Sequence, residues 1–167
     1  MNYKEAITKL NFDNVSFEEL PVKVGEKIND IITEYLEFSD EIIENLPDNI
    51  KLVYLIGELE SAILYDGLLS IFYNNTLKEI ERYEKAIQKT ESKKLLQLFL
   101  KAKALVSKEY TLKQDKTFLE AFPDKDVYDF FSESLIEIIE NIEEKITELQ
   151  DKGEYWNRIE NQFQSKN

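Results

Sequence analysis

The stretch NIKLVYLIGELESAILYDGLLSIFY, residues 49–73, decides the fold. Its apolar residues fall on most sides of a helix rather than on one stripe, which is typical of a helix at the centre of a domain. Glu58, Glu60 and Asp66 interrupt the run, so it is too polar to cross a bilayer. We therefore predict a central core helix over 49–73 that kinks near Gly67.

Amphipathic helices are predicted on both sides of this segment. Residues 22–46 place apolar side chains at three- and four-residue spacing and read as one helix. A capping box, Thr76 to Glu79, starts a helix that ends near Lys89, and another is expected over 93–107. Residues 109–125 contain Pro123 and are expected to form a long loop with at most one helical turn.

A long helix is predicted over 126–150, followed by a short closing helix around 155–163. The long helix carries a seam of apolar residues spaced 4, 3, 4 and 3 apart, which resembles a coiled-coil seam. The seam consists of Leu135, Ile139, Ile142, Ile146 and Leu149. The side chains expected to be buried together are Leu55, Leu59, Ile63, Phe72, Leu96, Phe99, Leu135 and Ile139.

Composition favours one all-α domain over residues 1–167, with about six helices around the central apolar helix. The chain is 43% hydrophobic, enough for a core, and its 4 Gly and 3 Pro leave little room for the many tight turns of a β-sandwich. It has no cysteine, which excludes disulfides, thiolate zinc sites and thiol nucleophiles. The N-terminus lacks the features of a signal peptide. These observations favour a bacterial-type cytoplasmic protein.

The charge is strongly acidic and unevenly distributed. Acids number 34 and bases 21, with no histidine, for a net charge of −13. Residues 1–77 carry −10, residues 78–116 carry +5 and residues 117–167 carry −8. Two acidic segments repel nucleic acid and anionic membranes and attract basic proteins. The chain has only two arginines, and the basic segment is interleaved with glutamates, so we expect it to balance the acidic helices within the molecule or between subunits.

No catalytic, metal or cofactor site is predicted. Glu58, Glu60 and Asp66 could form an all-carboxylate cation site, but the absence of histidine excludes the Glu-x-x-His pattern of di-iron bundles. There is neither a glycine-rich phosphate loop nor a nucleophile elbow. Pairs of carboxylates at helical spacing are inevitable with 34 acids, so they do not by themselves indicate acid–base catalysis.

Two acidic stripes are the candidate partner-binding residues. Both repeat at three- or four-residue spacing, which puts carboxylates about 5–6 Å apart along a helix axis. One stripe carries fewer charges per unit length than duplex DNA, so two stripes side by side would be needed to match the charge density of DNA. A solubilising surface would show the same pattern. The stripes are Asp30, Glu34, Glu37, Glu41 and Glu44, and Glu133, Glu137, Glu140, Glu144 and Glu148.

Residues 67–74, GLLSIFYN, resemble the signature of a bacterial domain-of-unknown-function family that includes a DNA-mimic protein. That signature runs Asn-Gly-Gly-Phe-x-Gln-Phe-Phe-x-Asn. Gly67 matches its second glycine, Phe72 its second aromatic residue and Asn74 its asparagine. Tyr65 and Asp66 replace Asn-Gly, while Leu68, Ser70 and Ile71 replace Phe, Gln and the first aromatic residue. The resemblance covers residues 45–105 and implies an all-helical fold.

The resemblance and the charge together favour an acidic, non-enzymatic binding protein that occupies the basic face of a DNA-binding protein such as a transcriptional regulator. Neither nucleic acid nor membrane is an expected partner, and a homodimer stays open. One alternative is a small-ligand protein or enzyme with a pocket near Tyr65, Asp66, Gly67 and Asn74. Another is an immunity-type protein that neutralises a basic toxin.

Overall fold

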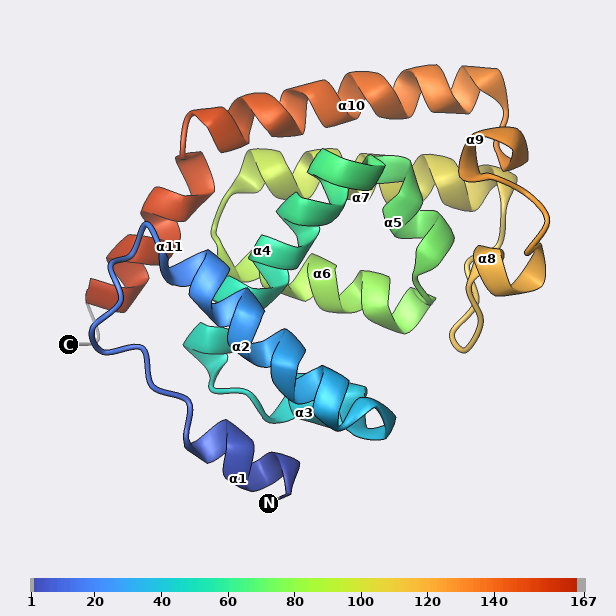
Figure 1. Cartoon of the computed structure of the whole chain (residues 1–167). Helices are drawn as coiled ribbons and strands as arrows, with labels where there is room; N and C mark the ends of the chain where they lie inside the picture. Colours follow the sequence, from blue (N-terminus) through green and yellow to red (C-terminus); the bar gives the residue numbers. More distant parts are fainter. Residues whose placement is uncertain (1, 165–167) are drawn as a thin grey trace. The chain divides into compact units, whose positions relative to one another are not determined.

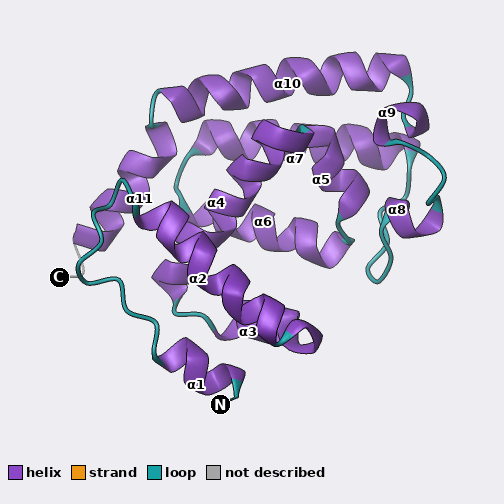
Figure 2. Cartoon of the chain, in the orientation of Figure 1, coloured by secondary structure: helices purple, strands orange, loops and turns teal. Residues whose placement is uncertain are grey.

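The computed structural model describes residues 2–164, and this part of the chain is 77% helical and contains no strand (Figures 1 and 2). The all-α prediction is confirmed. The expected number of about six helices is wrong, because the described residues form eleven α-helices, eight of them with seven or more residues. The excess has two sources: each of the three longest predicted helices is broken once, and short helices form outside the predicted ones.

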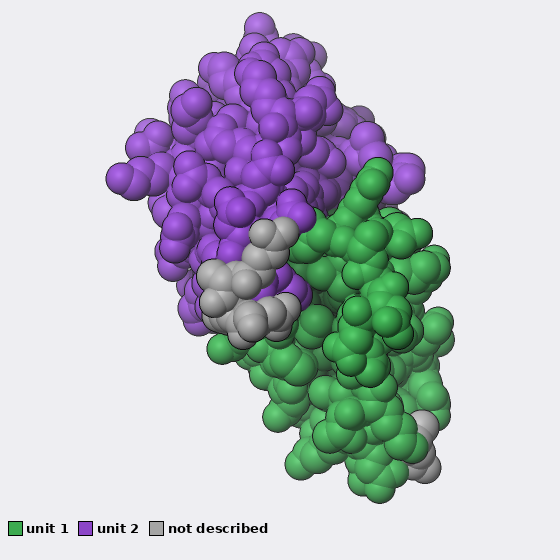
Figure 3. Space-filling model, turned by 90° about the vertical axis from the view of Figure 1, so that its left-hand side faces the viewer, with its two compact units in different colours: residues 1–58 green, residues 59–167 purple. Residues whose placement is uncertain are grey.

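The helices in chain order are α1 (Tyr3–Thr8), α2 (Leu20–Glu34), the 3₁₀-helix η1 (Leu36–Phe38), α3 (Ser39–Asn45), α4 (Asp48–Asp66), α5 (Leu68–Asn74), α6 (Leu77–Lys89), α7 (Lys93–Glu109), α8 (Phe118–Ala121), α9 (Val127–Phe130), α10 (Glu133–Asp151) and α11 (Glu154–Gln164). The chain divides into two compact units, residues 1–58 and residues 59–167 (Figure 3). That these form one domain stays a prediction.

In the first unit the predicted helix over 22–46 is interrupted at Tyr35, whose φ and ψ of −127° and 49° are not helical. An unbroken helix of that length would extend about 37 Å. The break instead lets α3 pack on both α1 and α2. Ile31 and Ile42 are buried on the two sides of the break, and Phe38 stacks on Tyr3 with ring centroids 5.2 Å apart. Burial in this three-helix group offsets the helical hydrogen bonds lost at the break.

The predicted central helix breaks at Gly67, where a kink was expected. Gly67 has φ 82° and ψ 158°, a conformation that is almost exclusive to glycine. Asn74 ends α5, but not in the left-handed conformation that asparagine often adopts at a helix end, since Glu91 is the only described non-glycine residue with positive φ. Asn75 satisfies the helix end instead, because its Nδ2 donates to the Ile71 carbonyl at 2.9 Å.

In the second unit α10 packs on α7 and α5, and α7 packs on α6 (Figure 1). Phe72 and Phe99 are fully buried, with ring centroids 5.7 Å apart. Of the eight predicted core residues seven are buried, and the exception is Leu96, which is half-buried. The neighbouring Leu95 takes the core position, because it lies on the same face of α7 as Phe99.

The predicted helix over 126–150 is also interrupted, at Phe131, which is extended with φ −89° and ψ 156°. Phe130 and Phe131 are both buried and meet at right angles, 5.0 Å between centroids. Consecutive residues on a helix point about 100° apart. The break lets both rings enter one aromatic cluster with Tyr73, Tyr110 and Phe118. Tyr110 and Phe118 of this cluster fix the segment 109–125 against the rest of the unit. That segment was expected to be a long loop with at most one helical turn, and α8 is that turn.

Candidate functional site

The five glutamates predicted on the last long helix form one exposed stripe along α10. We call this set, Glu133, Glu137, Glu140, Glu144 and Glu148, the α10 stripe, and all five are exposed. At 3.6 residues per turn they fall within roughly 80° of the helix circumference, centred opposite the buried seam of Leu135 to Leu149. The seam is buried where α10 packs on other helices of the second unit, so the stripe faces solvent. It spans about 22 Å, or one carboxylate per ~5–6 Å.

The charge of the stripe is largely uncompensated on its own helix. Residues 133–151 hold seven acids and a single base, Lys145. Within the described residues Glu133, Glu137, Glu140 and Glu144 form no ion pair, while Glu148 pairs with Lys152 at 3.7 Å. The basic helices α6 and α7 lie on the seam side of α10 (Figure 1). The stripe thus points away from most of the lysines in this unit.

The lysines of α6 and α7 serve in part to join these two helices. Lys103 Nζ lies 2.7 Å from Glu84 Oε2, and both side chains are only about one-fifth exposed, at 21% and 22%. The bridge links α7 to α6 at a site shielded from solvent, where an ion pair is worth more than at the surface. Both residues belong to the basic segment itself, so its role in balancing the acidic helices stays a prediction.

The other predicted stripe does not lie on one helix. Asp30 and Glu34 belong to α2, Glu37 to η1, and Glu41 and Glu44 to α3, all of them exposed. The break at Tyr35 interrupts the spacing that the sequence suggested. That this set and the α10 stripe share one solvent face stays a prediction.

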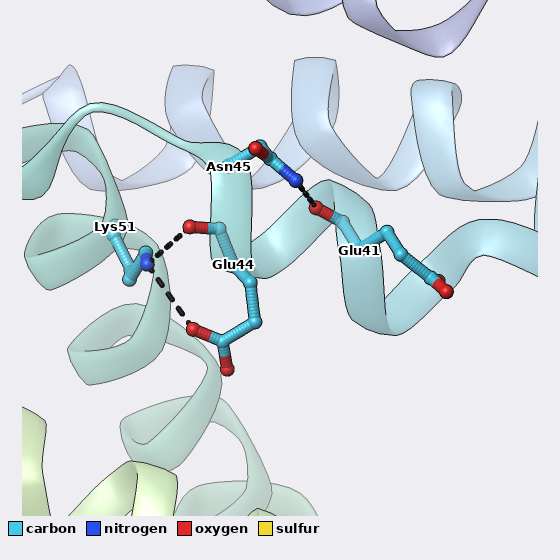
Figure 4. A network of polar contacts seen from close by, with 4 residues as sticks. All are labelled: Glu41, Glu44, Asn45 and Lys51. Carbon is cyan, nitrogen blue, oxygen red and sulfur yellow. Dashed lines mark hydrogen bonds and ion pairs between the residues drawn. The ribbon is translucent and has the colours of Figure 1, made fainter.

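Part of this second set is neutralised by hydrogen bonds to a lysine (Figure 4). Lys51 Nζ donates to the Glu44 carbonyl at 2.6 Å and lies 3.4 Å from its carboxylate. Asn45 Nδ2 donates to the Glu41 carbonyl at 2.7 Å, while the Glu41 carboxylate points away from Lys51. Glu44 therefore helps to join α3 to α4, whereas Glu41 remains available at the surface.

The three carboxylates considered as a cation site do not converge. Glu58 accepts from Asn29 Nδ2 at 3.2 Å, and Asp66 is exposed at the end of α4. Glu60 accepts from Trp156 Nε1 at 2.7 Å and from the Tyr155 hydroxyl. In residues 2–164 no group of three or more Asp, Glu, His or Cys side chains is arranged to hold a metal ion.

The Glu60 contacts create a buried polar cluster between α4 and α11. Burial raises the pKa of Glu60 above its usual 4.5, and the two hydrogen bonds oppose that shift in part. Burial also raises the pKa of Tyr155, and the adjacent Glu60 charge adds to the effect. Tyr155 is 1% exposed, so its hydroxyl stays protonated and donates to the carboxylate. The cluster anchors α11 to α4.

An open pocket of about 610 Å³ lies in the second unit beside Gly67. One wall is the end of α4 and the start of α5, and the other is the α8–α9 segment together with Glu143 of α10. The predicted pocket residues Tyr65, Asp66, Gly67 and Asn74 all line it, together with Leu64, Leu119, Lys125, Asp126, Tyr128 and Glu143. Leu64, Tyr65, Leu119 and Tyr128 form an exposed apolar rim, 68%, 80%, 45% and 49% accessible.

The conformation of Gly67 explains how the pocket is assembled. The Gly67 backbone directs the Leu68 N–H toward α10, where Glu143 Oε2 accepts it at 2.7 Å. A Cβ on Gly67 would lie 3.3 Å from that oxygen and 3.2 Å from the Tyr128 hydroxyl. The Tyr73 hydroxyl donates to the Lys125 carbonyl at 2.6 Å and so fixes the opposite wall. Of the three motif residues, Gly67 and Asn74 line the pocket and Phe72 belongs to the core.

Sequence reasoning missed the far wall of the pocket, formed by Leu119, Lys125, Asp126, Tyr128 and Glu143. Four of these residues lie in the segment 117–131, whose aromatic residues follow no helical or strand period. The sequence offered one weak indication of Glu143 as a pocket residue. Its position in the helical period lies between the buried seam and the exposed stripe of α10. A carboxylate at such a half-buried position requires a hydrogen-bond donor.

These features define an acidic protein, all-helical in its described residues, with an exposed carboxylate stripe and a pocket rimmed by tyrosines and leucines. A family model described as DMP19-like protein matches residues 44–167. The chain therefore belongs to the DMP19-like protein family, as the motif around Gly67 suggested. The matched residues include the whole α10 stripe and the pocket, whereas Asp30, Glu34, Glu37 and Glu41 lie outside them.

No curated protein and no solved structure matches the chain. Within its described residues, none of the helices combines the length and the apolar character that a membrane span requires.

Proposed function

We propose that this protein is a DNA mimic that binds the DNA-contacting face of another protein, with the α10 stripe in the position of a phosphate strand. The observation that carries the proposal is the alignment of five exposed glutamates opposite the buried seam of α10. Membership of the DMP19-like family supports it, because that family takes its name from a DNA-mimic protein.

The charge spacing of the stripe suits this role only in part. One strand of B-DNA presents a phosphate every 3.4 Å along the axis. The stripe presents a carboxylate every ~5–6 Å. A basic groove-binding surface would be attracted at long range and oriented along the stripe, with contacts elsewhere on the protein adding to the affinity.

The test compares two variants that have the same net charge. E137K/E140K/E144K reverses the middle of the stripe, and E91K/D115K/D124K reverses three exposed acids of the same unit outside it. Each raises the formal net charge from −13 to −7. Wild type and both variants are immobilised, exposed to lysate of the native host at low salt, and eluted with duplex DNA or with salt.

Retention of a DNA-binding protein by wild type and by the control, but not by the stripe variant, is the expected result. Duplex DNA and moderate salt should both release it, since the attraction acts between exposed charges. Equal retention on all three surfaces, or a captured protein that duplex DNA does not displace, contradicts mimicry. A captured basic toxin that does not bind DNA would not be displaced by duplex DNA, and would therefore contradict mimicry.

A further inference from the structure

We propose that the pocket beside Gly67 receives an arginine side chain of the basic protein that docks on the α10 stripe. The proposal rests on the proposed function for the identity of the partner. It adds a second contact of different chemistry, in which tyrosine rings and carboxylates hold one guanidinium group.

The charge of the pocket selects a cation. Asp66, Asp126 and Glu143 line it, against one base, Lys125. Lys125 Nζ lies 5.8 Å from the centroid of the Phe130 ring, so it already has a cation–π partner. Burial and the charges of Glu143, Glu140 and Asp126 together raise the pKa of the Tyr128 hydroxyl. Tyr128 therefore stays protonated within a negative field.

The rim of the pocket selects the kind of cation. Tyr65 and Tyr128 are large exposed aromatic rings on its two walls, and Leu64 and Leu119 lie beside them. A guanidinium group stacks on aromatic faces and donates bidentately to carboxylates, whereas an ammonium group is more strongly hydrated and lacks the planar fork. The aliphatic stem of arginine would cover the exposed leucines. A pocket of about 610 Å³ also leaves room for the adjoining backbone.

The pocket is next to the stripe, so one partner can reach both. Glu140 of the stripe and Glu143 of the pocket are three residues apart on α10, which makes them neighbours on the helix surface. Glu140 also acts electrostatically on Tyr128. A basic surface aligned on the stripe would bring an arginine at its edge to the mouth of the pocket.

The experiment uses a blocked Gly-Arg-Gly peptide and follows backbone amide chemical shifts of the full-length protein. The matched ligands are the citrulline peptide, which is neutral and nearly the same shape, the lysine peptide and free arginine. The arginine peptide should shift Gly67, Leu68 and Tyr128. It should bind at least about tenfold more tightly than the citrulline peptide, because the cation–π attraction and several exposed ion pairs are lost with the charge.

The variant D66N/D126N/E143Q removes three charges but keeps the acceptors for the Leu68 and Tyr128 amides. It should weaken arginine-peptide binding about tenfold without altering the fold, while the control E91Q/D115N/D151N should not. Equal binding of the arginine and citrulline peptides, or shifts confined to the α10 stripe, would overturn the proposal. Tighter binding of free arginine than of the peptide would indicate a small-molecule site and overturn it too.

The peptide experiment contains no partner protein, so the two proposals can fail separately. Loss of partner capture with intact arginine-peptide binding would reject DNA mimicry and keep the pocket. If capture of the partner depends on the stripe but the arginine peptide does not bind, the pocket proposal is rejected and DNA mimicry is kept.

Discussion

Gly67 fixes both the end of α4 and the geometry of the pocket. Its φ of 82° and ψ of 158° turn the chain so that the Leu68 N–H meets Glu143 of α10 rather than a carbonyl of its own helix. A residue with a side chain cannot adopt this backbone conformation without strain. The glycine of the family motif therefore has a structural reason that does not depend on a ligand.

Replacing Gly67 by alanine should lower the free energy of unfolding by about 1–3 kcal/mol, the usual cost of a backbone held in a region that favours glycine. The new Cβ would also press on the Tyr128 hydroxyl at 3.2 Å. Chemical denaturation provides the measurement. Gly25→Ala is the control, because Gly25 lies inside α2 with its nearest neighbour at 4.0 Å and should gain about 0.4–1 kcal/mol. Similar changes in both variants would contradict the strained geometry at Gly67.

Glu60 should make stability depend on pH. Its pKa in the folded protein lies above the usual 4.5, so the native state holds this proton more tightly than the unfolded state does. Stability from this group is therefore present at low pH and declines as pH rises through the raised pKa. Glu60→Gln, which cannot ionise and keeps an acceptor, should match wild type near pH 4 and exceed it near pH 8.

Denaturation at a series of pH values tests this prediction, with Tyr155→Phe as the second variant. Loss of the Tyr155 hydroxyl removes a hydrogen bond that favours the carboxylate, so the dependence on pH should become larger. Parallel profiles for wild type and Glu60→Gln would show that Glu60 is not desolvated in the folded protein.

At the scale of the element, α10 depends on a new start at Ser132. Because the chain is extended at Phe131, α10 needs its own N-cap, and Ser132 Oγ accepts from the Leu135 N–H at 3.3 Å. The same hydroxyl donates to Glu109 at the end of α7, 2.8 Å away. Ser132 thereby sets where α10 begins and so the register of its stripe.

Ser132→Ala should cost about 0.5–2 kcal/mol of stability, the usual loss on removing a serine N-cap. Ser134→Ala serves as the control because Ser134 is exposed inside the first turn, where alanine is a better helix former. Thermal or chemical denaturation of the two variants distinguishes them. If Ser134→Ala lowers the free energy of unfolding as much as Ser132→Ala does, the Ser132 side chain is not the N-cap that stabilises α10.

For the whole molecule, the net charge of −13 produces self-repulsion that the α10 stripe intensifies. Like charges three or four residues apart on a helix are destabilising by about 0.2–0.5 kcal/mol a pair. A stripe kept at this cost is consistent with a binding role.

The variant E137Q/E140Q/E144Q should therefore be more stable than wild type at low salt, by a few tenths of a kcal/mol for each pair relieved. The gain should shrink as salt screens the repulsion. Denaturation at about 20 mM and 500 mM salt measures both effects, on either side of the ionic strength at which the Debye length is about 10 Å. E91Q/D115N/D124N, which removes exposed charges of the same unit that lie outside α10, should gain less. A stripe variant less stable than wild type would mean that these glutamates support the fold.

The sequence by itself determined the helical class, the seam from Leu135 to Leu149 and the exposed glutamates opposite it. These follow from the 3.6-residue period, which depends only on neighbours along the chain. The same local reasoning located the core residues Phe72 and Phe99 and the helix starts after Thr76 and at Lys93.

Only the tertiary structure decided that the long helices also break at Tyr35 and Phe131, and what the three breaks assemble. At Tyr35, Gly67 and Phe131 the helical hydrogen bonds compete with burial against side chains far away in the sequence, and burial prevails. The pocket combines α4, α5, the α8–α9 segment and Glu143, up to about 80 residues apart. Local periodicity carries no information about contacts at that separation, so the residues of the pocket become neighbours only when the helices pack.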